Sequence, residues 1–234
     1  MKRLLLIIAC TVMMLFISSF SQAQQTIFNI PSADATDKGK IYLGHASQFR
    51  LNNPGRYWYV TDYFAYGLGN QTDLEATLYN TSWPVSGNVS LGVGFKSTFP
   101  LLIGNHSKAE LCLTVGSQAL FSLQGNGIGV WGYSHLSGRI PKTKTRLTAG
   151  ISVGHKQLFG KNTVHFIGGV EQPVIARIAL IADWYSGKHA LGFATFGGSI
   201  LIAKSSAITV GYQVPNDSKV AGKPGFTFGI TKFF

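Results

Sequence analysis

The chain has 234 residues, room for one domain or at most two, and only 12% of them are charged. Soluble domains carry roughly 25% charged residues. The body of the chain nevertheless has no long apolar run, because its apolar residues and its 28 glycines are dispersed. This composition disfavours both an ordinary soluble domain and a helical membrane protein, and it favours strands with one apolar face.

The N-terminus predicts an export signal. Lys2 and Arg3 precede a mostly apolar stretch, Leu4–Ile17, and small residues then lead up to Ala23. We therefore expect residues 1–23 to be a signal peptide that is cleaved after Ala23. A membrane anchor is one alternative, although the stretch is shorter than the roughly 20 residues of a span. A lipoprotein signal at Cys10 is another, but the apolar run continues past it.

The mature chain alternates with a period of two, which predicts strands. Val89, Leu91, Val93 and Phe95 share one face, while Ser90, Gly92, Gly94 and Lys96 share the other. Twelve such runs are separated by turn residues such as Gly69-Asn70. They lie near 40–51, 57–67, 73–83, 88–98, 109–122, 127–139, 145–158, 163–172, 176–186, 189–202, 206–214 and 225–234. The apolar face of the first run is interrupted by His45.

These runs predict an all-β fold, an antiparallel transmembrane β-barrel of about twelve strands over residues 39–234. Ten or fourteen strands are the alternatives. An even count places both termini on the periplasmic side, so we expect residues 24–38 to form an N-terminal periplasmic segment. Small polar residues on the second face suit a crowded lumen, and aromatic residues near strand ends suit interface girdles. A soluble β-sandwich is the competing interpretation.

The last strand carries an assembly signal by resemblance. Phe226, Phe228, Ile230 and Phe234 alternate toward the C-terminus and resemble the terminal strand of bacterial outer-membrane proteins. The resemblance implies recognition by the barrel-assembly machinery in the outer membrane of a Gram-negative bacterium, with outer-membrane lipid as a partner. Lys232 departs from that pattern, in which a tyrosine or an apolar residue is usual.

Three further segments resemble an uncharacterised family of bacterial porin-like outer-membrane barrels. They are Phe28–Asp34 with Lys38-Gly-Lys40 after it, Tyr66–Glu75, and Asp183–Gly187. The resemblance implies the barrel architecture and leaves the substrate open, because fold and function separate easily.

The alternation of side chains along each predicted strand indicates which charged residues line the lumen. The lumen-lining candidates are Lys96, Arg146, Lys156, Glu171, Arg177 and Asp183. Acidic residues balance basic ones on this face, so the formal charge of +11, or +9 without Lys2 and Arg3, lies mainly in turns. We therefore predict a small, weakly selective porin-like channel for small hydrophilic solutes. A non-conducting structural barrel is an alternative.

An enzyme is the other alternative. His135 and Ser137 are two residues apart on one strand, and they resemble the His-x-Ser pair of some outer-membrane lipid hydrolases. The acidic residue and the asparagine of those families are missing from the sequence that follows, so no catalytic residue is assigned. Gly127–Gly132 spells a dinucleotide fingerprint but lies in a strand pattern, and the histidines have no metal spacing. We expect no cofactor, no metal and no nucleic-acid partner.

Overall fold

The computed structural model describes residues 25–50, 57–81, 89–101, 110–125 and 127–234. The predicted signal peptide and its cleavage at Ala23 lie outside these residues. The strands are β1 (Ile41–Arg50), β2 (Tyr57–Gly69), β3 (Thr72–Tyr79), β4 (Ser90–Leu101), β5 (Glu110–Ser122), β6 (Ile128–Arg139), β7 (Arg146–Gly154), β8 (Val164–Ile175), β9 (Ile178–Tyr185), β10 (Phe193–Ala203), β11 (Ser206–Pro215) and β12 (Gly225–Phe233). Two short helices, α2 (Lys156–Phe159) and α3 (Ser218–Ala221), lie between strands.

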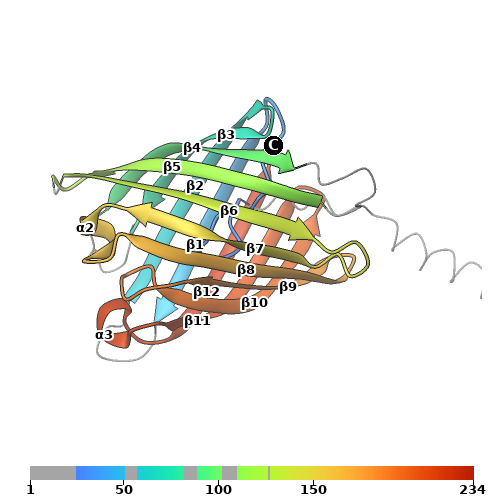
Figure 1. The fold of residues 1–234 in the computed structure, drawn as a ribbon. Helices are drawn as coiled ribbons and strands as arrows, with labels where there is room; N and C mark the ends of the chain where they lie inside the picture. Colours follow the sequence, from blue (N-terminus) through green and yellow to red (C-terminus); the bar gives the residue numbers. More distant parts are fainter. Residues whose placement is uncertain (1–24, 51–56, 82–88, 102–109, 126) are drawn as a thin grey trace, which may run out of the picture.

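The twelve strands form one closed antiparallel barrel in chain order (Figure 1). The first and last strands close it, with Tyr42 opposite Phe233 and Phe49 opposite Phe226. The predicted fold and strand count are therefore confirmed. The predicted strand over 145–158 ends early, at Gly154, because the next residues turn into α2.

The two ends of the barrel differ in their connections. At the end of the barrel where β12 finishes, the connections within the described residues are short turns, and Asn70 and Gln71 both have positive φ, as a two-residue hairpin requires. At the opposite end the connections are longer and include α2 and α3 (Figure 1). No described helix is long and apolar enough to cross a membrane.

The barrel is apolar outside and polar inside. On β12, Phe226, Phe228 and Ile230 are exposed, while Thr227 and Thr231 are buried. β7 repeats this pattern with Leu147 and Ile151 outside and Thr148 and Ser152 inside. A soluble barrel has the reverse arrangement, so this wall suits contact with lipid.

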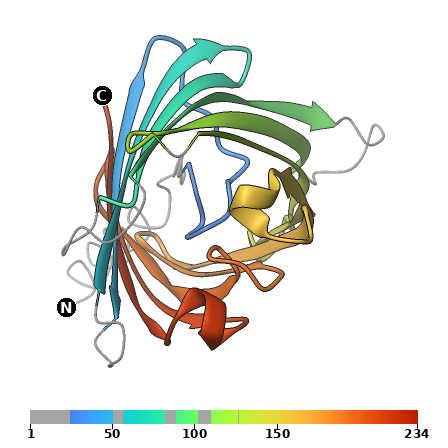
Figure 2. The ribbon, with the colours of Figure 1, turned by 90° about the vertical axis from the view of Figure 1, so that its left-hand side faces the viewer.

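The N-terminal segment lies inside the barrel. Figure 2 looks along the barrel and shows this segment, in blue, within the ring of strands. We expected residues 24–38 to form an N-terminal periplasmic segment; in the structure, residues 25–36 lie against inward-facing side chains of the barrel. The physical reason is that the lumen offers both apolar contacts and charged partners for this segment.

Candidate functional site

Residues 25–32 form a small hairpin across the lumen. Ile27 N donates to Ile30 O at 2.9 Å, and Ser32 N donates to Gln25 O at 3.0 Å. Ile27 and Ile30 are buried in a cluster with Ile167, Ile181 and Tyr185 from the wall. The hairpin therefore has its own apolar core inside a polar lumen.

Asp183 on β9 holds the tip of this hairpin. Its Oδ2 accepts from the backbone N–H groups of Phe28, Asn29 and Ile30 at 2.9, 2.5 and 3.0 Å. Its Oδ1 accepts from Asn29 Nδ2 at 2.9 Å. Three successive amides aimed at one oxygen make an anion-binding nest, which stabilises a buried carboxylate without a cation.

Asn29 is held from two further strands. Its Nδ2 lies 2.5 Å from Thr195 Oγ1 on β10, and its Oδ1 accepts from Gln213 Nε2 on β11 at 2.8 Å. The tip of the hairpin is thus fixed to β9, β10 and β11 together.

A second anchor lies on β3 and β4. Asp73 accepts from Gln25 Nε2 at 2.9 Å and from Thr36 N at 2.9 Å. Lys96 Nζ lies 3.6 Å from Asp73 Oδ2, and it donates to Gln25 Oε1 and to Asp34 O. β3 and β9 are six strands apart in a ring of twelve, so the segment connects opposite walls.

Arg146 on β7 makes the third anchor. Its Nη1 and Nη2 donate to the two oxygens of Asp34 at 2.8 and 2.9 Å, a bidentate pair. Its Nε lies 3.4 Å from Glu171 Oε1 on β8. Removing one partner of such a buried group typically costs about 3–5 kcal/mol, because it leaves an uncompensated charge.

Inward glycines make room for the segment. A Cβ on Gly169 would meet the Ile27 side chain, one on Gly211 would meet the Phe28 ring at 2.7 Å, and one on Gly67 would meet the backbone of Thr36 and Asp37. These three glycines therefore make room for the chain's own N-terminal residues in the lumen.

Four of the six predicted lumen residues face inward together: Lys96, Arg146, Glu171 and Asp183. The other two lie outside the strands. Lys156 is exposed on α2, where the strand pattern has ended, and Arg177 is exposed in the turn between β8 and β9. Parity fails at both positions because neither belongs to a strand.

The His135 and Ser137 pair also faces the lumen. Ser137 Oγ lies 3.2 Å from His135 Nδ1 and 2.7 Å from Thr148 Oγ1, and both residues are about 1% exposed. Lipid would contact the other side of this wall. The placement therefore gives no support to lipid hydrolysis by this pair.

A different histidine network faces outward. His45 Nδ1 lies 2.7 Å from Asp62 Oδ1, and His45 Nε2 lies 2.9 Å from Ser47 Oγ. When Nδ1–H donates to Asp62, Nε2 can accept from the serine hydroxyl, which is the order of a serine-hydrolase triad. Sequence reasoning missed this network, although His45-x-Ser47 has the spacing of His135-x-Ser137 and interrupts an apolar face.

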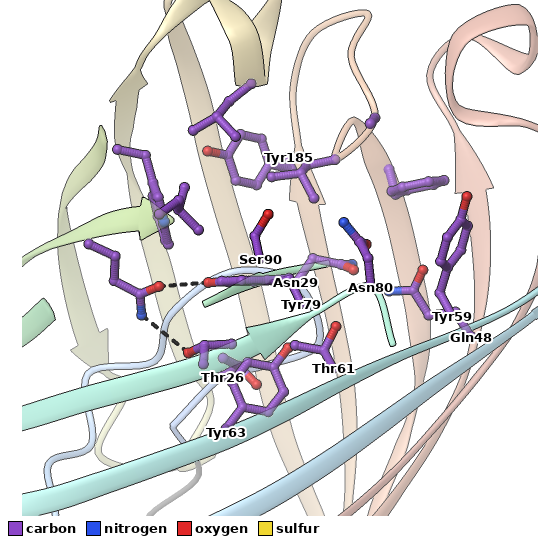
Figure 3. Close-up of a pocket in the computed structure, with 18 of the residues that line it drawn as sticks. Thr26, Asn29, Gln48, Tyr59, Thr61, Tyr63, Tyr79, Asn80, Ser90 and Tyr185 are labelled. Carbon is purple, nitrogen blue, oxygen red and sulfur yellow. Dashed lines mark hydrogen bonds between the residues drawn. The ribbon is translucent and has the colours of Figure 1, made fainter. Parts of the chain in front are cut away.

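The rest of the lumen contains a chamber of about 750 Å³ (Figure 3). The N-terminal hairpin forms its floor, through Gln25, Thr26 and Asn29, and α3 forms part of its rim. Figure 3 shows Tyr63, Tyr79 and Tyr185 around one space, and Tyr79 OH donates to Gln118 Oε1 at 2.7 Å. Among the described residues, no group of three potential metal ligands comes together.

The site is thus a membrane-type barrel whose lumen holds its own N-terminal segment beneath an aromatic chamber. No family model and no curated protein matches the chain. Among solved structures, it is similar to the outer membrane protein Omp33 of Acinetobacter baumannii, with a TM-score of 0.49 and 10% identity. That match covers 84% of this chain and 99% of the other. The resemblance to an uncharacterised porin-like family stays a prediction.

Proposed function

We propose that the protein is an outer-membrane channel for small hydrophilic solutes and that its N-terminal segment closes it at rest. The observation that carries this proposal is that one lumen holds both a tethered segment and, next to it, a chamber of about 750 Å³ with a polar and aromatic lining. A purely structural barrel would need no such chamber.

Sidedness follows from the connections. Outer-membrane barrels have short periplasmic turns and longer extracellular loops. In this orientation the chamber lies toward the exterior, and the Arg146–Asp34 pair lies toward the periplasm. A solute enters the chamber first and passes only when the hairpin moves.

Conductance in planar bilayers tests the proposal. The mature chain should show small or brief currents, and a variant without residues 25–37 should show larger and steadier ones. Heat-modifiable gel mobility checks that both proteins form the barrel. Silence of both folded proteins at all voltages would reject the channel, and equal steady currents would reject closure by the segment.

The outward histidine network favours a second candidate, hydrolysis of a membrane lipid ester. Ser47 Oγ would attack the ester carbonyl while His45 Nε2 takes its proton, and the alcohol would leave with that proton. Water would then release the acid and regenerate the serine. This candidate ranks second because Ser47 is only 3% exposed, so an ester must displace its neighbours.

A fluorophosphonate probe separates the two candidates. A lipid hydrolase should label at Ser47, lose the label in Ser47→Ala, and keep it in the control Ser137→Ala. An unlabelled wild-type barrel would exclude the hydrolase and leave the channel proposal unaffected.

A further inference from the structure

The chamber has the size and depth of a binding site. Its volume of about 750 Å³ lies within the range of roughly 300–1,000 Å³ that is usual for small-molecule pockets. Its lining comes from strands on both sides of the barrel and from both helices, so the walls are largely preformed. A ligand of one or two sugar rings would fit such a space.

Aromatic rings form a large part of the lining. They belong to Tyr42, Tyr59, Tyr63, Tyr79, Trp131, Tyr133, Tyr185 and Phe193. The face of an aromatic ring is electron-rich and attracts weakly positive C–H groups. The C–H faces of a sugar ring meet this requirement, and tyrosine adds a hydroxyl at the ring edge.

Uncharged polar groups lie between the rings. They belong to Gln25, Thr26, Asn29, Gln48, Thr61, Thr77, Asn80, Ser90, Gln118 and Ser218. Amides and hydroxyls both donate and accept hydrogen bonds, as sugar hydroxyls do. In addition, the buried Tyr133 hydroxyl has no hydrogen-bond partner among the described residues, so a ligand hydroxyl that reached it would satisfy it.

Charge excludes the main competitor, an acidic solute. Among the described lining residues the only acidic side chain is that of Glu75 and the only lysine or arginine is Lys219. Glu75 is already engaged, since Gln118 Nε2 lies 3.2 Å from its Oε2 and Lys96 Nζ lies 4.0 Å from its Oε1. An anion would lose its hydration here without gaining a cluster of cations. The basic excess of the chain therefore does not determine what the chamber holds.

We propose that this chamber binds uncharged sugar rings as free mono- or disaccharides. This inference rests on the proposed function and names its substrate class. The bound ring would lie on the hairpin floor next to Asn29, so the hairpin must move before the ring can pass.

Binding to the full mature protein tests the proposal. The probes are maltose, glucose, uridine, glucuronate and indole, measured by calorimetry in an amine-oxide detergent without a sugar headgroup. Saturable binding of maltose or glucose, stronger than that of glucuronate, is expected. If uridine binds as well, the sugar ring that these ligands share is the group that the chamber recognises. Binding of uridine alone, of indole alone or preferentially of glucuronate, or of none of the probes, would overturn the proposal.

Two variants of β2 locate the binding. Tyr59→Leu removes a ring from the chamber and should weaken sugar binding roughly tenfold. Tyr66→Leu removes a ring from the outer face of the same strand and should leave binding unchanged. Equal effects in both variants would place the sugar elsewhere. If the deletion variant conducts but the intact protein binds no sugar, only this inference fails. If the intact protein binds sugar but neither protein conducts, only the channel proposal fails.

Discussion

Asp183 holds Asn29 twice, through the backbone N–H at 2.5 Å and through the side-chain amide at 2.9 Å. The two residues are 154 positions apart in the sequence. This contact fixes the N-terminal hairpin in the lumen, and it is the most direct place to test whether the hairpin closes a channel.

Asp183→Asn should loosen the hairpin without leaving a buried charge unpaired. The carboxylate makes four charge-assisted hydrogen bonds, and hydrogen bonds to charged groups contribute about 1.5–3 kcal/mol each. Loss of about 1.4 kcal/mol raises the population of the displaced hairpin roughly tenfold. We expect more frequent channel openings in bilayer recordings. Asp217→Asn, at the N-cap of α3, is the control and should open no more often than the wild type.

Gly211→Ala tests the same closure by steric means. The added methyl group would meet the Phe28 ring, so the hairpin must shift at a cost of about 1–3 kcal/mol. Protease added to the folded barrel should then cleave the N-terminal segment faster. Gly198→Ala is the matched control and should leave the cleavage rate unchanged, because the nearest neighbour of its added Cβ would be Ala179 O at 3.4 Å. Equal cleavage rates for the two variants would contradict the placement of Phe28.

Arg146→Gln should lower the free energy of unfolding by about 3–5 kcal/mol, because Asp34 and Glu171 would lose their shared cation. Urea unfolding in lipid vesicles, followed by tryptophan fluorescence, measures the change. Arg177→Gln, in the exposed turn between β8 and β9, should change it by less than about 0.5 kcal/mol. If the two variants unfold alike, the buried triad does not stabilise the barrel.

The pH dependence of folding stability should follow the protonation of His189, which lies near the chamber rim. Burial lowers the pKa of His189 below its usual value, the hydrogen bond to Ser186 O opposes this, and the neighbouring His165 acts with burial. Its Nε2 donates to Ser186 O at 2.8 Å and its Nδ1 accepts from Leu191 N at 3.2 Å, so the ring is neutral. Leu191 lines the chamber.

A histidine whose pKa is depressed on folding stabilises the protein fully above its unfolded pKa of about 6.5. The unfolded chain binds the proton more readily as the pH falls, so this stability is lost between about 6.5 and the lower folded value. Urea midpoints measured from pH 8 to pH 5 should therefore decline, and His189→Gln should decline less. A parallel decline in both proteins would assign the effect to other groups.

The C-terminal signal remains a proposal that assembly assays can test. Phe226, Phe228, Ile230 and Phe234 all point outward, and Phe234 N donates to Ile41 O across the closing seam at 2.9 Å. Deletion of Phe234 should slow membrane insertion by the assembly machinery, which pulse-chase heat-modifiability measures. Lys232→Tyr should be neutral or faster, although it removes the cation above the Phe234 ring. Normal insertion of the deletion variant would refute the signal.

Local alternation was enough to predict the strands and the wall, because each residue of β12 takes its face from a period of two. It also gave the inward direction of Lys96, Arg146, Glu171 and Asp183. It could not give their partners, because Asp34 lies 112 residues from Arg146. Phe28–Asp34 attracted notice only by resemblance, and its asparagine, proline and aspartate have no strand pattern that predicts a place in the lumen.

The position of the hairpin also constrains how the barrel can assemble. Its residues precede β1, yet they contact strands from β3 to β11, and the β1–β12 seam encloses them. If the ring closed first, the hairpin would have to enter a narrow lumen and form all three buried anchors there afterwards. The simpler order of assembly is that the N-terminal hairpin forms first and each strand then packs against it. The barrel would then assemble around its own N-terminal residues, and the size of this enclosed segment would help to set the number of strands in the ring.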